Sequence, residues 1–290
     1  MTYLLAIGGC SDAVTGRIDR YDPAADSWTS IGSLGCRRQN LAAAVFEGRI
    51  YACGGLDYES DPDKSVEQGD LTGAEWVEDP WLKDPRYHHA AVNLGGRLYV
   101  LGGCCSTDRE SSIDVFEPSG ESESRWVRAG ELPVPMAPAI ATVVDGRVWI
   151  AGELEYSKWE LWSGELPAGP WTREAAFSLD RMWPAVCAFQ GAFYFCGGVV
   201  GDQESEQTLS PRVERFDLAS RSLQALPDMP TARQGATAVG ADGRVYVMGG
   251  FDPSSSEAMT ALEAFDLAAQ TWHTLAPLEE GRYGICALAI

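Results

Sequence analysis

The sequence predicts an all-β fold of six four-stranded antiparallel units, because one short phrase recurs six times along the chain. Each copy is an apolar run that ends in a glycine pair or its remnant: YLLAIGG, IYACGG, LYVLGG, VWIAGE, FYFCGG and VYVMGG. The first glycines of successive copies lie 45 to 52 residues apart, which is the range expected of propeller blades. The copies span the whole chain, so we expect a single domain over residues 1–290.

Each repeat divides into four short runs separated by turn residues, which predicts four antiparallel strands. The first run, such as residues 89–94 or 235–241, ends in a two-residue turn that favours positive φ. The second run ends at the glycines, whose recurrence indicates a close backbone approach rather than six active sites. The predicted turns are Glu47-Gly48, Gly95-Gly96, Asp145-Gly146, Gln190-Gly191 and Asp242-Gly243.

The third run carries an acidic residue two places before an aromatic one, and the fourth run carries a tryptophan. The acidic residues are Asp19, Asp114, Glu160, Glu214 and Glu263, with Glu67 preceding Gly69 in the second repeat. The tryptophans are Trp28, Trp76, Trp126, Trp171 and Trp272, with Leu223 in the fifth repeat. A catalytic group has no reason to recur in every repeat, so both sets predict structural roles, with the rings filling the space between sheets.

The ends of the chain fall within one predicted sheet. Residues 282–290 align with the first run of the other repeats, whereas the chain begins at a second run. We therefore expect residues 284–290 to pair with residues 3–7, so that no sheet edge is left open.

These features resemble the Kelch repeat family, in which a glycine pair is followed by an acidic-x-aromatic-acidic stretch and then a tryptophan. RIDRYDPAADSW and ALEAFDLAAQTW lie close to the family pattern, and the resemblance covers the whole chain. Glu153 departs from the pattern in the fourth repeat and Gly69 in the second. The resemblance implies a six-bladed β-propeller with four antiparallel strands per blade, closed by pairing of the N- and C-terminal strands in one blade.

Composition and charge exclude several partners. Lys and Arg total 22 against 42 Asp and Glu, and a net charge of −20 repels phosphate backbones and anionic lipids. We therefore expect neither a nucleic-acid partner nor a membrane partner. The sequence has no run of 18 apolar residues and no basic leader, so we expect a cytoplasmic protein whose eight cysteines are reduced.

Motifs for catalysis are missing from the sequence. The chain has three histidines, and the adjacent His88 and His89 would point to opposite faces of a strand, so they cannot both bind one metal ion there. No nucleophile elbow, phosphate-binding loop or C-x-x-C pair is present. We expect no metal, no cofactor and no enzymatic activity.

Basic residues recur at two registers. An arginine lies just before the first strand in five repeats, at Arg38, Arg86, Arg181, Arg233 and Arg282, with Met136 in the fourth. The position four residues before the third-strand aromatic holds Arg17, Ser65, Ser112, Lys158, Arg212 and Ala261. The Kelch resemblance implies that both registers face the mouth of the propeller channel, where they are candidate ligand-binding residues. The alternative is that the arginines pair with the third-strand acids or with carbonyls.

Two acidic loops, at residues 57–64 and 201–207, are expected on the same face and would make the rim negative around a positive well. Arginine suits bidentate recognition of a carboxylate there. The resemblance implies a protein-interaction propeller that binds an acidic peptide or partner, as the substrate-recognition part of a ubiquitin ligase or a scaffold. It also allows a sialate-mutarotase-like enzyme or binder of a small anionic metabolite, and an actin or cytoskeletal scaffold. We expect a monomeric propeller that is either part of a larger chain or a natural stand-alone protein.

Overall fold

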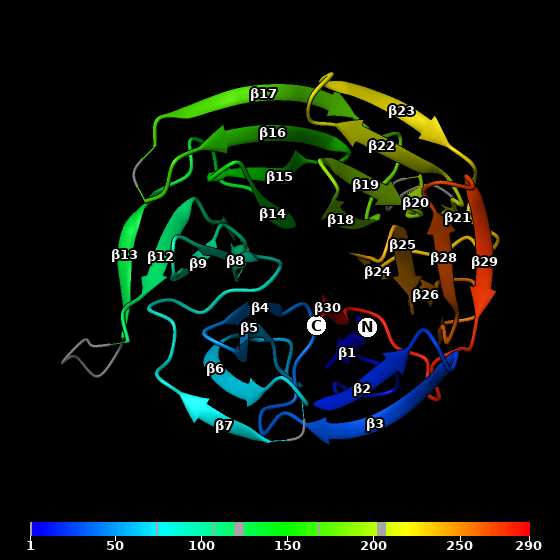
Figure 1. Ribbon diagram of the computed structural model, residues 1–290, viewed down its shortest axis with the longest axis horizontal. Helices are drawn as coiled ribbons and strands as arrows, with labels where there is room; N and C mark the ends of the chain where they lie inside the picture. The colour runs from blue at the N-terminus through cyan, green and yellow to red at the C-terminus, as the bar shows by residue number, and fades with distance from the viewer. Residues whose placement is uncertain (1, 74, 107, 119–124, 168, 202–206) are drawn as a thin grey trace. The chain divides into compact units, whose positions relative to one another are not determined.

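The structure is a computed structural model that describes residues 2–73, 75–106, 108–118, 125–167, 169–201 and 207–290. Its strands form six four-stranded antiparallel sheets, so the predicted six-bladed β-propeller is confirmed (Figure 1). No helix occurs among the described residues, and hence none that is long and apolar enough to cross a membrane.

Contacts divide the chain into two compact units. The middle unit comprises Gly16–Ile18 and Ile31–Ser178 and holds the second, third and fourth blades. The second blade contains β4 (Ala42–Phe46), β5 (Arg49–Leu56), β6 (Pro62–Asp70) and β7 (Trp76–Asp79). The third contains β8 (Ala90–Leu94), β9 (Arg97–Leu101), β12 (Ser112–Phe116) and β13 (Trp126–Glu131). The fourth contains β14 (Ala139–Val144), β15 (Arg147–Glu155), β16 (Lys158–Gly164) and β17 (Trp171–Ser178).

The terminal unit comprises Met1–Thr15, Asp19–Ser30 and Leu179–Ile290. The fifth blade contains β18 (Ala185–Phe189), β19 (Ala192–Cys196), β22 (Val213–Asp217) and β23 (Ser222–Leu226). The sixth contains β24 (Thr237–Ala241), β25 (Arg244–Met248), β28 (Leu262–Asp266) and β29 (Thr271–Leu275). The first blade joins β30 (Cys286–Ala289) to β1 (Leu4–Ile7), β2 (Arg17–Asp22) and β3 (Ser27–Ser33), the last two of which extend across the unit boundary.

Three two-stranded ribbons follow the second strand of three blades. They are β10 (Cys104–Cys105) with β11 (Asp108–Arg109), β20 (Val199–Val200) with β21 (Thr208–Leu209), and β26 (Phe251–Asp252) with β27 (Glu257–Ala258). Because the strands alternate in direction, the connection from second to third strand and the chain entering the first strand lie at the same end of each blade. We call this the loop end.

The opposite end carries the predicted two-residue turns. Both residues of each turn have positive φ, for example 48° at Glu47 and 74° at Gly48. This conformation matches the twist of the flanking strands and explains the choice of glycine or a tolerant polar residue. The predicted hairpins are therefore confirmed.

Apolar side chains pack between neighbouring blades within each unit. In the middle unit, Phe116 of the third blade contacts Tyr51 of the second at a ring-centroid distance of 5.5 Å and Trp126 of its own blade at 5.3 Å. In the terminal unit, the Trp272 indole NH donates to the Pro227 carbonyl of the preceding blade at 2.8 Å. The third-strand aromatics and fourth-strand tryptophans thus hold successive blades together, as the repeat predicts.

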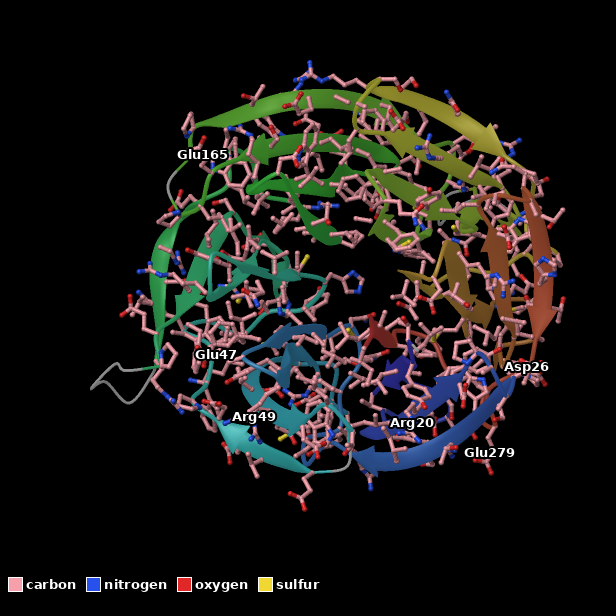
Figure 2. All side chains as sticks on the ribbon, viewed as in Figure 1. Arg20, Asp26, Glu47, Arg49, Glu165 and Glu279 are labelled. Carbon is pink, nitrogen blue, oxygen red and sulfur yellow. The ribbon has the colours of Figure 1, made fainter. Side chains whose placement is uncertain are left out.

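The terminal strands pair as predicted. β1 and β30 are antiparallel, with Leu4 opposite Ala289 and Ile7 opposite Cys286. Asp26, labelled in Figure 2, adds side-chain links in this region by accepting hydrogen bonds from the Tyr21 hydroxyl at 2.6 Å and the Ala276 amide at 2.8 Å. Burial and the nearby Asp26 carboxylate raise the pKa of Tyr21.

Candidate functional site

The five register arginines lie inside the blades rather than on their surface. Each is at most 1% exposed, and each guanidinium forms an ion pair with the third-strand acid of its own blade. Nη2 of Arg38 lies 2.5 Å from Glu67, and that of Arg86 lies 2.6 Å from Asp114. The remaining pairs are Arg181 with Glu214, Arg233 with Glu263, and Arg282 with Asp19.

Backbone carbonyls complete the surroundings of each guanidinium. Arg233 donates to the carbonyl of Gly249 at 3.2 Å and to that of Ala261 at 2.9 Å. The first carbonyl belongs to the glycine pair, and the second belongs to the register that we expected to face a ligand. Equivalent bonds join Arg38 to Gly54 and Ser65, Arg86 to Gly102 and Ser112, Arg181 to Gly197 and Arg212, and Arg282 to Gly8.

The arginine backbone also explains the glycine pair. The Arg233 carbonyl accepts a hydrogen bond from Gly198 of the preceding blade at 2.8 Å, and a Cβ on Gly197 would lie 2.6 Å from the same oxygen. Only glycine allows this approach, and φ is positive at both positions. The arginine therefore links two blades through its backbone carbonyl, and it links two strands of its own blade through its side chain.

This geometry corrects the expectation that Arg38, Arg86, Arg181, Arg233 and Arg282 contact a ligand directly. A ligand would have to displace a buried carboxylate, and breaking such a pair costs about 3–5 kcal/mol. Burial lowers the pKa of Arg86 and Arg233, while Asp114 and Glu263 oppose that shift. The physical reason for the difference is that each blade supplies its own counter-charge.

In the fourth blade, the position that holds the arginine in the other blades is occupied by an uncharged residue. Met136 replaces the arginine, is fully buried and packs over Gly152. The corresponding acid, Glu160, instead accepts from the Trp162 indole NH at 2.9 Å and pairs with Arg173 at 3.3 Å. An apolar contact thus takes the place of the buried ion pair where the arginine is missing.

The second register divides between buried and exposed side chains. Ser65 and Ser112 are buried, and the Ser65 hydroxyl accepts from Arg38 at 2.6 Å. Arg17 is partly buried. Lys158 is 66% exposed beside Glu155, and Arg212 is 54% exposed in an ion pair with Asp180. Only the last two therefore present a mostly exposed cation.

The acidic loops are described in part. Within residues 57–64, the Asp57 carboxylate accepts from the Glu59 and Asp61 amides, and Tyr58 is 73% exposed. Residues 202–206 of the second loop lie outside the described residues.

A backbone position with positive φ follows each arginine by two residues. φ is 54° at Asn40, 54° at His88, 51° at Trp183, 60° at Gly235 and 62° at Gly284. The conformation serves a line of backbone hydrogen bonds from blade to blade. In the terminal unit, Gly235 donates to Trp183 at 3.2 Å and Gly284 donates to Gly235 at 3.1 Å. In the middle unit, His88 donates to Asn40 at 3.0 Å and accepts from Ala139 at 2.9 Å.

Trp183 is the unusual member of this line. A bulky residue at positive φ is an outlier that costs about 1–3 kcal/mol, and such strain concentrates at functional sites. Its side chain is nevertheless 39% exposed at the loop end of the fifth blade. The next position along the line is Gly235, where an added Cβ would meet only the Tyr283 Cβ, at 3.8 Å. Trp183 was not among the residues predicted from the sequence, although glycine at the aligned positions 235 and 284 marks this position.

Among the described residues, no group of three potential metal ligands is present. His89 is 5% exposed, and neither ring nitrogen has a hydrogen-bond partner in the described part of the chain. Burial lowers the pKa of His88 to about 4 and that of His89 well below its ordinary value. Both rings are therefore neutral at pH 7.

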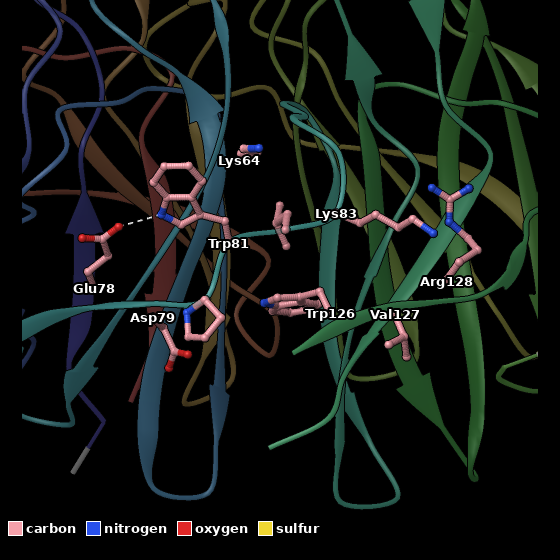
Figure 3. Close-up of a pocket in the computed structure, with 10 residues that line it drawn as sticks. Lys64, Glu78, Asp79, Trp81, Lys83, Trp126, Val127 and Arg128 are labelled. Atoms are coloured by element: carbon pink, nitrogen blue, oxygen red, sulfur yellow. Dashed lines mark hydrogen bonds between the residues drawn. The ribbon is translucent and has the colours of Figure 1, made fainter. Parts of the chain in front are cut away.

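A cavity of about 900 Å³ opens beside the connection between the second and third blades (Figure 3). Trp81, Lys64 and Lys83 line it from the second blade and its connection, and Trp126 and Arg128 line it from β13. No residue of the two sequence registers lines it. The sequence contains a signal for this cavity, because the chain has only three lysines and two of them line it.

Comparisons with known proteins agree with this architecture. A family model described as the Kelch motif matches residues 37–79, 85–133 and 232–279, which correspond to the second, third and sixth blades. A solved structure titled "Structure of YjhT" superposes with a TM-score of 0.72 over 94% of this chain and 97% of that one. Its sequence identity is 15%, so this likeness shows the fold alone.

Curated relatives are similar to this protein over most of its length. Alpha-scruin of Limulus polyphemus is 27% identical over 76% of this chain and 25% of its own length. Kelch-like protein terF of Aspergillus terreus is 24% identical over 85% of this chain and 57% of its own length. Kelch-like protein 35 of Mus musculus is 23% identical over 91% and 44%. The chain thus spans from a quarter to somewhat more than half of these relatives, and its second, third and sixth blades match the Kelch motif.

Proposed function

We propose that this propeller is a protein-interaction module that binds an acidic segment of a partner protein at its loop end. Kelch motifs in three of the blades support an interaction role, and one relative is named Kelch repeat and BTB domain-containing protein 1. The module would then act as the recognition part of a larger assembly, such as a ubiquitin ligase or a scaffold.

The observation that carries the proposal is the exposed and strained Trp183. Its backbone is fixed by the hydrogen bond that its carbonyl accepts from Gly235, so the point from which the ring projects is set before a partner arrives. A partly exposed tryptophan supplies a large contact area at a low entropic cost, and tryptophan is enriched among residues that dominate binding energies. Gly235, the next position in the line of hydrogen bonds after Trp183, leaves room for a side chain of the partner.

The preference for an acidic segment rests on Arg212 at the same end of the fifth blade. Its guanidinium is 54% exposed and pairs with Asp180, which is itself 58% exposed. Exposed pairs of this kind contribute about 0–1 kcal/mol, so a partner carboxylate can replace Asp180 at little cost. The buried register arginines support the blades and leave this exchangeable cation to meet the partner.

Selection from a random peptide library displayed on phage tests the proposal. Wild type should enrich acidic peptides, Trp183→Gly should weaken their binding at least tenfold, and Arg212→Ala should weaken it severalfold. Trp183→Gly keeps the positive φ without strain, so its fold should survive. Asn40→Gly is the matched control, because it places glycine at the equivalent positive-φ position of another blade without removing an aromatic ring, and it should bind as wild type does. Enrichment of peptides without acidic residues, or full binding by Trp183→Gly, would overturn the proposal.

A further inference from the structure

We infer that the Trp81 groove is a second docking surface, which takes an acidic segment of a partner protein anchored by an apolar side chain. The groove is defined by Lys64, Glu78, Trp81, Lys83, Trp126 and Arg128. It lies wholly in the middle unit, whereas Trp183 belongs to the terminal unit. The inference therefore goes beyond the proposed function and does not depend on Trp183.

Trp81 is held in an exposed position. The indole NH of Trp81 donates a hydrogen bond to the carboxylate of Glu78 at 2.6 Å, and the Lys64 ammonium lies 5.1 Å from the centroid of the Trp81 ring. The next residue, Leu82, is buried and donates its amide to the Lys64 carbonyl at 2.8 Å. These contacts fix the ring while 47% of Trp81 stays exposed beside the cavity. Val77, on β7, is a further 50% exposed apolar side chain close by in the chain.

The lysines give the groove its charge. The chain has three lysines among its 22 basic residues, and two of the three line this cavity. Neither Lys64 nor Lys83 has a carboxylate partner among the described residues. Figure 3 shows the Lys83 side chain extending toward Arg128, which places two cations on one side of the groove.

The carboxylates near the groove are already engaged. Asp79 is buried and pairs with Arg125 at 2.9 Å. Arg128 pairs with Asp84 at 2.6 Å and with Asp114 at 2.7 Å. Glu78 accepts the Trp81 indole NH. The two lysines are thus the cations left to meet a ligand, in a protein whose net charge is −20.

Charge complementarity and the exposed Trp81 ring together indicate which kind of ligand the groove binds. One ammonium group beside an exposed indole and a second that lines the same cavity match a short segment whose carboxylates meet the lysines and whose apolar side chain packs on Trp81. A cavity of about 900 Å³ accommodates several residues of such a segment.

Fluorescence anisotropy with a labelled probe peptide tests the inference. The probe is an octapeptide of aspartate and glutamate with one central phenylalanine, and a second probe replaces the phenylalanine with serine. We expect Lys64→Gln/Lys83→Gln and Trp81→Ala each to weaken binding of the first probe at least tenfold. Loss of the phenylalanine should weaken binding to wild type severalfold and leave Trp81→Ala unaffected.

Matched controls come from the fourth blade. Arg147→Gln/Arg173→Gln removes the same net charge from exposed positions of the same unit, and Tyr156→Ala removes a 68% exposed aromatic ring. Both should bind as wild type does, with all melting temperatures compared first. Equal weakening by the control pair would show a general charge effect and overturn the inference.

Two further outcomes separate this inference from the proposed function. Loss of probe binding in Trp183→Gly with full binding in the groove variants would refute the groove and leave the proposed function standing. Self-association of wild type that the groove variants abolish, seen by sedimentation, would identify a second copy as the occupant and overturn the assignment to a partner segment.

Discussion

A guanidinium that is buried loses its hydrogen bonds to water. Each register arginine replaces them with bonds to a carboxylate and to at least one backbone carbonyl. The arrangement repeats in five blades with the same 16-residue separation between arginine and glycine carbonyl for Arg38, Arg86, Arg181 and Arg233. The pair fixes the third strand against the chain entering the blade. The ion pair stabilises the blade only when both partners are present, because removing one partner leaves the other charge buried and unpaired.

Arg233→Met should therefore destabilise the protein by about 3–5 kcal/mol, because it leaves the Glu263 carboxylate buried without its cation. Arg233→Met/Glu263→Leu should recover much of that loss, since the fourth blade already packs Met136 at the same position. Urea unfolding measures the three free energies of unfolding. A double variant less stable than the single variant would argue against this account.

The two adjacent histidines make stability depend on pH. In the folded state the pKa of His88 is lowered to about 4 and that of His89 well below its ordinary value, whereas unfolded histidine titrates near 6.5. Below pH 6.5 the unfolded chain binds more protons, so stability should fall with pH through the window from 6.5 to about 4. The slope is at most about 1.4 kcal/mol per pH unit for each histidine, and His88, being partly exposed, should contribute less.

The second blade supplies the matched variant, because its aligned residues are Asn40 and Leu41. His88→Asn/His89→Leu should lose less stability than wild type between pH 7.5 and 4.5, as followed by urea unfolding at each pH. Asparagine tolerates the positive φ at position 88. An unchanged pH dependence would show that other groups control acid unfolding.

At the scale of elements, the pairing of β1 with β30 joins the two ends of the chain. β1 is completely buried, and the Tyr3 and Ile290 backbones exchange two hydrogen bonds of 2.9 Å. Deleting residues 284–290 should abolish the cooperative thermal transition, because an apolar strand edge is then exposed. Ile290→Ala keeps the backbone pairing and should lower the melting temperature only slightly. A truncated protein that melts like wild type would contradict this expectation.

Second strands and connections should also differ in thiol reactivity. Cys53 and Cys196 lie on buried second strands, and burial raises the pKa of Cys196 to about 12. Cys36 is exposed in the connection that enters the second blade. Iodoacetamide should therefore modify Cys36 first and reach Cys53 and Cys196 only after denaturation, as mass spectrometry of the labelled peptides can show. Rapid native labelling of Cys196 would contradict the packing described.

The sequence predicts these elements well and the site poorly, for a physical reason. Strands, turns and the shared terminal blade follow from local periodicity, which is visible in every repeat. Whether Arg86 faces solvent depends instead on Asp114, 28 residues away, and the same pattern fits an exposed cation or a buried pair. The exposure of Trp81 depends on Lys64 and Glu78 in the same way, since only the fold brings Lys64 over the ring.

At the scale of the whole molecule, a net charge of −20 opposes the approach of any acidic partner. The exposed cations act only at short range, because charges more than about 8–10 Å apart are largely screened at physiological ionic strength. Long-range repulsion and short-range attraction therefore act on different steps of binding. Repulsion slows the encounter, whereas contacts with residues such as Lys83 slow dissociation.

Salt should consequently change the two rate constants in the same direction. Raising ionic strength screens the net charge and should increase the association rate constant of an acidic peptide, while weakened lysine contacts increase its dissociation rate constant. The affinity should thus fall only moderately, unlike the steep loss when a basic surface binds a polyanion. Stopped-flow anisotropy over a range of NaCl concentrations measures both constants, with a glutamine-substituted neutral peptide as the control. An association rate constant that falls as salt rises would mean that a locally positive field steers the peptide, and that the lysines act beyond contact range.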